Sequence, residues 1–492
     1  MGARHLGKQS KIWLVAVLML AMLLPHLQAK AASLETPIST YIDYAPETPR
    51  GRFTLMQSVN TAIKNFPSVR TARFRLQASK ADVSLAKTAY LPRLDTSIQA
   101  MRGTTNLITG TILPQYLDVI PVQAGTEQKN PSMKSYFGTN YGANFNWLLY
   151  DFGLRASNVQ LADAQRKYAA ANIRLTELDV AYKAADDYLR TVENIATIRA
   201  QQATVERMQA AAVTAHTLVD TGLRAGVDAA LADYELSQAK IGLIQAERAA
   251  ELSRVDLAEA MGIAGAIVQI VSDPLVESPS RAFRVPKLIP SNHPLLQARA
   301  AAIQTESAKV KVQDKAYAPH IFFQSAFWGR GTGNRTTQKS LADGILPRIP
   351  NFVVGFSVNF PAMDYFEIKF RKSHAKAEEL AEKSNFDLAV QVLEQKDARA
   401  RVLLAQARRI ADETPTLVRA ARENQVKTLE RYGVGLSDMV AVAQAERMLA
   451  GAEVENAIAQ VEVWRAILAA AYVQGDLKPF LNLVAIAERK VP

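Results

Sequence analysis

The stretch of sequence that decides the fold is Phe137–Gly153, FGTNYGANFNWLLYDFG. From 137 to 149 the odd positions are mostly aromatic or apolar, whereas most even positions hold Asn or Gly. Such a period of two is typical of a β-strand whose two faces meet different surroundings. After Gly153 the pattern changes to that of a helix. The stretch therefore predicts a long amphipathic strand that passes directly into a helix.

The helix that follows is predicted to be unusually long. Residues 154–221 form a run of 68 without Gly or Pro, and a helix of that length would extend about 100 Å. Because an isolated helix has little stability in water, this one needs neighbouring helices along its length. Apolar and Ala residues spaced by seven predict coiled-coil packing. They are Leu161, Tyr168, Leu175, Tyr182 and Leu189, then Ala164, Ala171, Leu178, Ala185 and Val192, and finally Ile198, Val205, Ala212 and Val219.

The same plan occurs twice. Residues 65–67, Asn-Phe-Pro, return as Asn-His-Pro at 292–294, and Ala-Tyr-x-Pro at 89–92 returns at 316–319 with the same offset of 227. Similarity at a fixed offset indicates a duplicated unit. We expect each half to consist of a helix, two strands, a long helix, a turn and a shorter helix.

These patterns predict the bounds of each segment. We expect a signal peptide at 1–31, an N-terminal extended segment at 32–52, repeat 1 at 53–262, a Pro-rich linker or equatorial segment at 263–290, repeat 2 at 291–474, and a C-terminal equatorial tail at 475–492. In repeat 1 the helices are expected at 55–90, 154–221 and 223–260, and the strands at about 93–102 and 136–149. In repeat 2 we expect a helix at 295–317, strands at about 320–329 and 351–361, a long helix at 363–432 and a helix at 436–472.

Two local features qualify this plan. Pro415 falls inside the long helix of repeat 2 and is expected to kink or restart it, with Thr414 as the cap. Residues 329–333, Gly-Arg-Gly-Thr-Gly, are expected to form a surface loop.

The strands have the length of membrane-spanning strands. A tilted transmembrane strand needs about 9 to 11 residues, with apolar side chains on one face only. A soluble antiparallel sheet alternates in the same way, but the signal peptide and the long loops within each strand pair favour an outer-membrane barrel. The residues expected to face lipid are Phe137, Tyr141, Phe145, Trp147, Phe352, Phe356 and Phe360. Since four strands cannot close a barrel, it must be shared between subunits.

The N-terminus is predicted to be a secretory signal. A basic segment precedes an apolar run of 13 residues at 12–24, and Ala29 and Ala31 fit the small residues of a cleavage site. The run is too short to cross a bilayer as a helix. We expect cleavage after Ala31.

Composition excludes several functions. The formal net charge is +11, of which +7 belongs to the 461 residues after Ala31; so small a charge, without basic clusters, argues against nucleic acid. Cysteine is absent, which excludes disulfides, thiolate metal sites and a lipid-bearing N-terminal cysteine. The His and carboxylate residues lack metal-binding spacing. We therefore expect no catalytic residue, no cofactor and no metal site.

Taken together, the motifs resemble the TolC-type outer-membrane efflux family over about 53–474. They are the signal peptide, the duplicated Asn-x-Pro and Ala-Tyr-x-Pro motifs, the strand end Leu149–Gly153, and the Gly222-Leu223 turn leading to Asp228 and Ala232. The resemblance implies a mainly α protein with β: a homotrimer with one shared β-barrel in the outer membrane of a Gram-negative bacterium, continued by a coiled-coil tunnel into the periplasm. It implies three partners: outer-membrane lipid, a periplasmic membrane-fusion adaptor, and an inner-membrane pump of the RND or ABC type. The chain would be an unlipidated conduit for efflux or type I secretion.

The resemblance also implies where the tunnel meets its adaptor. The family's hairpin tips match 221–228 and 432–438. The residues implied in docking or closure are Gly222, Leu223, Asp228, Arg431, Tyr432, Gly435, Leu436 and Asp438. Repeat 2 has Ala441 where repeat 1 has Asp228, so a symmetric ring of charge pairs is not expected.

Two other functions are weighed against this one. A periplasmic coiled-coil adaptor or scaffold would share the Ala-rich helices but would not need strands of membrane length. A secreted hydrolase is disfavoured because no catalytic triad or metal constellation is present in the sequence. The transported substrate is not determined by the sequence.

Overall fold

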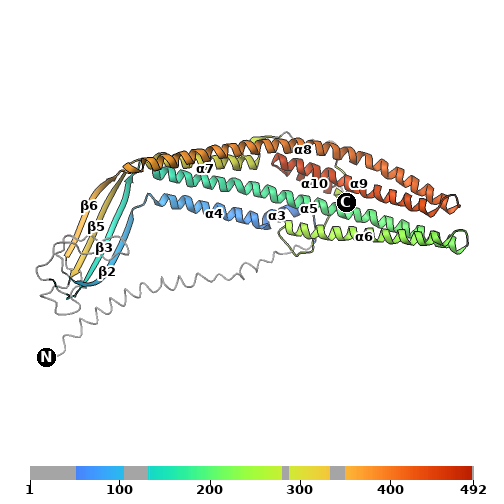
Figure 1. The fold of residues 1–492 in the computed structure, drawn as a ribbon, viewed down its shortest axis with the longest axis horizontal. Helices are drawn as coiled ribbons and strands as arrows, with labels where there is room; N and C mark the ends of the chain where they lie inside the picture. The colour runs from blue at the N-terminus through green and yellow to red at the C-terminus, as the bar shows by residue number, and fades with distance from the viewer. Residues whose placement is uncertain are drawn as a thin grey trace, which may run out of the picture.

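The protein is elongated, with a sheet at one end and two helical hairpin tips at the other (Figure 1). This computed structural model describes residues 51–104, 131, 133, 135–279, 288–332 and 349–489. The predicted signal peptide, with Ala29 and Ala31, lies outside the described residues, as do most of the two long loops.

Each half contains a helix, two strands, a long helix and a further helix in that order. The first half contains β1 (Arg52–Phe53), α3 (Leu55–Asn65), α4 (Pro67–Thr88), β2 (Arg93–Thr104), β3 (Ser135–Tyr150), α5 (Leu154–Asp220) and α6 (Gly226–Ala260). Between the halves lie β4 (Gln269–Ile270), η1 (Asp273–Leu275) and η2 (Pro290–Asn292). The second half contains α7 (Pro294–Ala316), β5 (His320–Thr332), β6 (Ile349–Asn359), η3 (Ala362–Asp364), α8 (Tyr365–Gly433), α9 (Met439–Gln474) and α10 (Lys478–Glu488). However, β1 and α3 have no counterpart in the described second half, and η3 and α10 have none in the described first half.

The long elements form a single layer. In the half next to the sheet the helices pack in the order α4, α5, α7, α8, and the antiparallel sheet continues this order as β2-β3-β5-β6. In the other half the order is α6, α5, α9, α8. The long helices α5 and α8 thus run through both halves, and shorter helices lie beside them (Figure 1). Within the described residues, no helix is both long and apolar enough to cross a membrane.

Three expectations about local structure are wrong. The expected helix 55–90 is two helices, because Phe66 is extended (ψ 129°) and Pro67 starts α4. Conversely, α8 continues through Pro415 without a restart; Thr414 is buried there and donates its hydroxyl proton to Asn456 Oδ1 at 2.9 Å. Residues 329–332 belong to strand β5 rather than to a loop, because they pair with β3.

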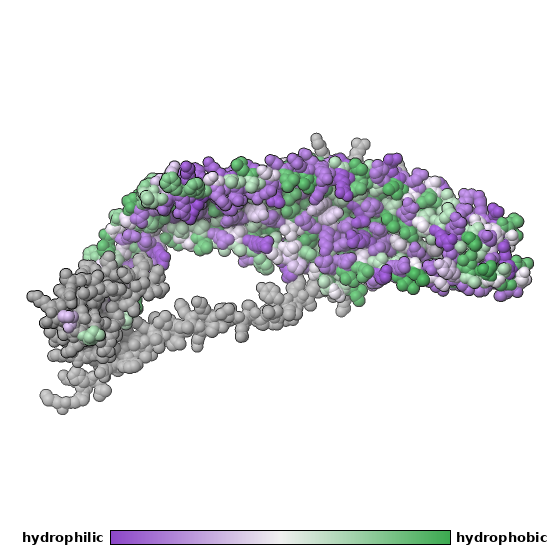
Figure 2. All heavy atoms as spheres, viewed as in Figure 1, coloured by the Kyte–Doolittle hydropathy of each residue, from purple (hydrophilic) through white to green (hydrophobic). Residues whose placement is uncertain are grey.

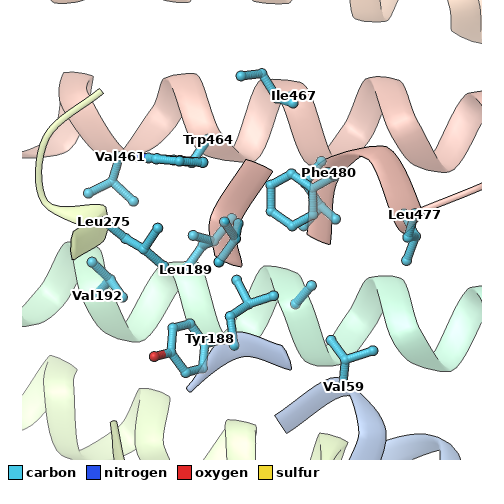
Figure 3. Close-up of a cluster of buried hydrophobic side chains, with 14 of the residues drawn as sticks. Val59, Tyr188, Leu189, Val192, Leu275, Val461, Trp464, Ile467, Leu477 and Phe480 are labelled. Atoms are coloured by element: carbon cyan, nitrogen blue, oxygen red, sulfur yellow. The ribbon is translucent and has the colours of Figure 1, made fainter. Parts of the chain in front are cut away.

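The largest hydrophobic core among the described residues lies where α3 and α10 pack beside α5 and α9, a region called the waist (Figure 3). Tyr188 of α5, Trp464 of α9 and Phe480 of α10 are almost completely buried there. Trp464 Nε1 donates to the carbonyl oxygen of Glu277 at 2.7 Å, and the Tyr188 hydroxyl donates to the carbonyl oxygen of Val271 at 2.7 Å. The described part of the predicted linker is therefore an ordered part of the fold. Strand β4 pairs in parallel with β1, and residues next to β4 in the sequence are buried in the core.

A glycine cap contacts each Asn-x-Pro motif. Gly262, after α6, would place a Cβ 3.0 Å from the backbone of 65–66, and Gly475, after α9, would place one 2.7 Å from Pro294 Cδ. Both have positive φ, +71° and +79°, a conformation that glycine adopts without strain. The duplicated motif thus lies where the start of α4 meets the end of α6, and where the start of α7 meets the end of α9.

Replacing Gly475 with Ala is expected to destabilise the waist. The added methyl group would collide with Pro294 and His293 in a backbone conformation that L side chains rarely adopt. We expect a loss of about 1–3 kcal/mol, measured as a lower midpoint of thermal unfolding by circular dichroism in detergent. Gly451→Ala is the matched control, since nothing lies within 4 Å of its Cβ position; it should leave stability unchanged or raise it slightly. Equal effects of the two substitutions would contradict this account.

Candidate functional site

The sheet exposes its apolar face, the reverse of what a soluble sheet does. The register places Phe145, Phe323 and Phe356 on one face of neighbouring strands. Their rings form a row, with centroids 5.8 Å apart between the first two and 5.4 Å between the last two. On the same face Phe352 is 77% exposed and Phe356 73% exposed. This aromatic face has no covering element among the described residues.

The opposite face of the sheet is more polar, although Phe322, Trp328 and Val353 also lie on it. It carries Asn140 and Asn144 of β3, which are both 6% exposed, paired in register with Gln99 and Asp95 of β2. On β5 and β6 the same face holds Gln324, whose amide oxygen lies 3.3 Å from the Ser357 hydroxyl. These amide and hydroxyl groups make a hydrophilic lining on one side of a membrane-length sheet.

Six of the seven residues expected to face lipid have described side chains, and all six belong to the apolar side. Tyr141, Phe145 and Trp147 alternate along β3, Phe352 and Phe356 along β6, and Phe360 follows β6 directly. Phe137 lies in β3 opposite Arg102, but its side chain is outside the described residues.

The strand-to-helix junction is fixed by a buried arginine. Arg155, in the first turn of α5, donates from Nε to Asp151 Oδ2 at 2.9 Å, and from Nη1 and Nη2 to the carbonyl oxygens of Leu148 and Leu149. Its guanidinium also lies over the Tyr90 ring, 4.6 Å from the centroid. Trp147 Nε1 donates to the Tyr90 carbonyl oxygen at 3.0 Å. The end of β3, the start of α5 and the end of α4 are thus joined at one point.

The two hairpin tips have the same backbone turn. Gly222 and Gly435 have φ of +74° and +83°. The next residue donates its N–H to a carbonyl oxygen five positions back in each case, Leu223 to Leu218 and Leu436 to Arg431, which is the Schellman pattern. Because this turn directs the following side chain outward, Leu223 and Leu436 are 71% and 69% exposed.

A cross-hairpin cluster ties the tips together. Arg224 Nη2 donates to the carbonyl oxygens of Tyr432 and Ser437 at 3.0 and 2.6 Å, and the guanidinium lies 4.6 Å from the centre of the Tyr432 ring. The Tyr432 hydroxyl donates to Asp228 Oδ2 at 3.2 Å. Burial, with the nearby Asp228 carboxylate, raises the pKa of the Tyr432 phenol, which therefore keeps its proton for this bond. The cluster joins Arg224 and Asp228 of the first hairpin tip to Tyr432 and Ser437 of the second, across 204 to 213 positions of sequence.

The structure brings together only some of the predicted tip residues. Asp228 and Tyr432 meet, whereas Asp438 caps α9 by accepting from the Ala441 N–H at 2.8 Å. Arg431 reaches only the Leu436 carbonyl oxygen, at 3.4 Å. Sequence reasoning missed Arg224. One signal for it was present: repeat 1 has this arginine at the position where repeat 2 has Ser437.

Polar contacts continue above the tips. Glu446, 1% exposed, accepts from Arg207 Nε at 3.2 Å and from Gln425 Nε2 at 2.6 Å, joining α5, α8 and α9. Glu453 pairs with the same Arg207 at 2.9 Å and with Arg422 at 2.8 Å. Because these groups pair across helices, they fix the two hairpins relative to each other. The described residues include no group of three or more His, Asp or Glu placed to hold a metal ion.

The fold and the site together describe an elongated protein whose coiled-coil wall continues into a sheet that is apolar on one face. The family described as "Outer membrane efflux protein" matches residues 58–263. The predicted resemblance to the outer-membrane efflux family is thereby confirmed, and this is a family of channels rather than enzymes. Among curated proteins, a sequence search finds no match.

Solved structures share the fold over most of the chain. VceC from Vibrio cholerae aligns with a TM-score of 0.68 at 15% identity, covering 86% of this chain and 96% of that one. The Campylobacter jejuni CmeC outer membrane channel gives 0.68 at 14%, covering 86% and 85%. The open state of the Neisseria gonorrhoeae MtrE outer membrane channel gives 0.65 at 18%, covering 86% and 89%. The mainly helical fold with a smaller sheet is thus that of outer-membrane channels.

Removing the Arg224 side chain is expected to loosen the tips. Arg224→Gln loses the charged donor and the stacked plane, and hydrogen bonds to charged groups contribute about 1.5–3 kcal/mol. Amide hydrogen exchange at 218–228 and 430–440 should therefore become about 10- to 100-fold faster. Arg431→Gln, which removes an exposed neighbour, should change it little. If both variants exchange at the wild-type rate, Arg224 does not hold the hairpins together.

Proposed function

We propose that this chain is one of three identical subunits of an outer-membrane export channel. The subunits together form one β-barrel in the outer membrane and one helical tunnel in the periplasm. A periplasmic adaptor and an inner-membrane pump of the RND or ABC type deliver the substrate, as in efflux or type I secretion. The chain is the passive conduit of this assembly and has no catalytic role.

The single observation that carries the proposal is the polarity of the sheet. Exposing a row of aromatic rings to water would be costly, at about 25 cal/mol for each Å² of apolar surface. Facing hydrocarbon removes that cost. The amide-lined opposite face then suits a water-filled lumen, as in membrane barrels. Phe137, Tyr141, Phe145, Trp147, Phe352, Phe356 and Phe360 are accordingly proposed to face lipid.

The open edges of the layer support association with further copies. Strands β2 and β6 end the described sheet and have one unpaired edge each, and unpaired backbone groups cannot lie in lipid. A closed barrel needs about eight strands or more, which a single four-stranded chain cannot supply. Three copies would supply enough and close the ring.

The outer sides of the edge helices carry matching apolar stripes. On α4, Phe74 and Leu85 are 66% and 68% exposed, and they lie on the side of this helix opposite its own residues that are buried against α5. On the other edge, Phe366, Phe370 and Leu380 of α8 are 62–68% exposed. The intervals within these stripes, 11 residues on α4 and 4 and 10 residues on α8, are sums of the three- and four-residue steps of a coiled-coil seam. We infer that α4 of one copy packs against α8 of the next.

The tips support the position of the adaptor. Leu223 and Leu436 are exposed apolar side chains on rigid turns at the end of the wall farthest from the sheet (Figure 1). In the assembly proposed, these turns with Gly222, Gly435, Arg431 and Asp438 face the adaptor, while Asp228 and Tyr432 hold the tunnel closed.

A periplasmic scaffold without a barrel is the alternative, and the sheet argues against it. The helical wall alone would suit a scaffold, because hydrophobic and hydrophilic residues are interspersed over it (Figure 2). A scaffold surrounded by water would not explain why the aromatic face of the sheet is exposed. Extraction from the membrane without detergent would favour the scaffold.

Two neighbouring valines of β6 provide a matched test of the barrel. Val354 lies on the apolar face and Val353 on the polar face, and they are 55% and 47% exposed. Arginine on a lipid-facing strand position costs about 2–4 kcal/mol near mid-membrane. Val354→Arg should therefore sharply reduce the amount of protein in the outer membrane, while Val353→Arg should not.

Wild-type protein in detergent should have about three times the mass of one chain, and a stable monomer would refute the trimer.

Substitution of a tip leucine should separate docking from insertion. Leu436→Asp places a charge on the proposed apolar contact and should abolish export while the channel still inserts and assembles normally. Ile267→Asp, at a 93% exposed residue of the waist, is the control and should export at the wild-type rate. Export would be measured as drug accumulation in cells that depend on this channel. Normal export by Leu436→Asp would remove the basis for placing the adaptor at the tip.

A further inference from the structure

A basic groove crosses one broad face of the wall just below the sheet. It has a volume of about 580 Å³ and is formed by side chains of α4, α5 and α7. Lys87, Lys167 and Lys311 line it, one from each helix, together with a single acidic residue, Asp163. The remaining polar lining residues are uncharged: Gln160, Gln304 and Ser307.

The positive charges of the groove exceed what its carboxylate can balance. Asp163 already pairs with Lys167 at 3.1 Å and with Arg166 at 2.8 Å. Among the described residues, Lys87 and Lys311 have no ion-pair partner. Both are exposed on the helix surface, so their ammonium groups face the space in front of the wall.

The groove lies on one side of the wall, and a second groove lies on the other. Along α7 the first is lined by 304, 307, 308 and 311, and the second by 306, 309, 312 and 313. Residues three or four apart share a side of a helix. The two sets therefore occupy opposite sides of α7.

The aromatic side of the sheet belongs with the second groove. Tyr317 follows Gln313 by four residues and so continues the side that lines this groove. Its ring lies 5.0 Å from that of Phe360 and 5.7 Å from that of Tyr365. Phe360 in turn continues the apolar positions of β6. The lysine groove is therefore on the side of the amide-lined face.

More lysines extend this basic side toward the sheet. Lys315 follows Lys311 by four residues, and its Cε lies 4.0 Å from the position of a Cβ at Gly153, at the start of α5. On α8, Lys369 and Lys376 are seven residues apart and lie on the side away from Phe370 and His374, which line the second groove. The basic side thus spans the wall from α4 to α8.

We propose that this face lines the upper tunnel and that its lysines favour the passage of anionic cargo over cationic cargo. The inference rests on the proposed function, because only in a closed ring does the amide-lined side become the lumen. There, Lys87, Lys167, Lys311 and Lys315 recur in every subunit around one narrow passage. A confined ring of like charge raises the local concentration of the opposite ion.

Ion selectivity across planar lipid bilayers tests the proposal. Lys87→Gln/Lys311→Gln removes two positive charges from the basic groove, and Lys309→Gln/Arg371→Gln removes two from the second groove. The chloride-to-potassium permeability ratio, taken from the reversal potential in a potassium chloride gradient, should fall by about twofold or more in the first variant and stay unchanged in the second. Equal ratios in the two variants and the wild type would overturn the proposal.

Thiol labelling gives an independent readout, since the chain has no cysteine of its own. In Lys311→Cys an anionic, water-soluble thiol reagent should reduce the conductance of single channels, because the residue faces the lumen. In Lys309→Cys, on the other side of α7, it should not. The reverse pattern would overturn the proposal. Folded wild-type protein that forms no channels would instead count against the proposed function.

Discussion

A single layer of helices cannot bury its two broad faces, and this constraint determines where every kind of residue goes. Each helix can bury only the narrow strips that touch its two neighbours. On α5 these strips are rich in alanine, such as Ala184 and Ala185, which are fully buried. Small side chains let helix backbones approach closely, so that many short contacts replace a thick core. The broad faces remain exposed and carry charged and polar residues interspersed with apolar ones.

At the waist the structure is thicker than a single layer, so larger side chains can be buried there. There α3, α10 and the segment around η1 add material beside α5 and α9, and the large residues Tyr188, Trp464 and Phe480 become buried. The two glycine caps at Gly262 and Gly475 fasten the shorter helices at the same level.

Periodicity was sufficient to predict the long elements, because it depends only on neighbours along the chain. The run at 154–221 and the alternation at 352–360 correspond to α5 and β6 within a few residues. The effects of prolines were harder to predict, since Pro67 begins a helix whereas Pro415 lies inside one. The partners of Arg224 could not be predicted, because they are main-chain carbonyl groups 208 and 213 positions away. The burial of the segment after Gly262 has the same cause: its contacts come from distant parts of the chain.

The composition of the waist has a consequence for the order of folding. Its core joins Phe53, near the start of the described chain, to Val484, near its end. Contacts of such long sequence separation form slowly, whereas adjacent helices pair quickly. The hairpins α5–α6 and α8–α9 can therefore form early, whereas the waist can close only once the last helix, α10, is present. Until then the hairpins lack the core that joins the two ends of the described chain.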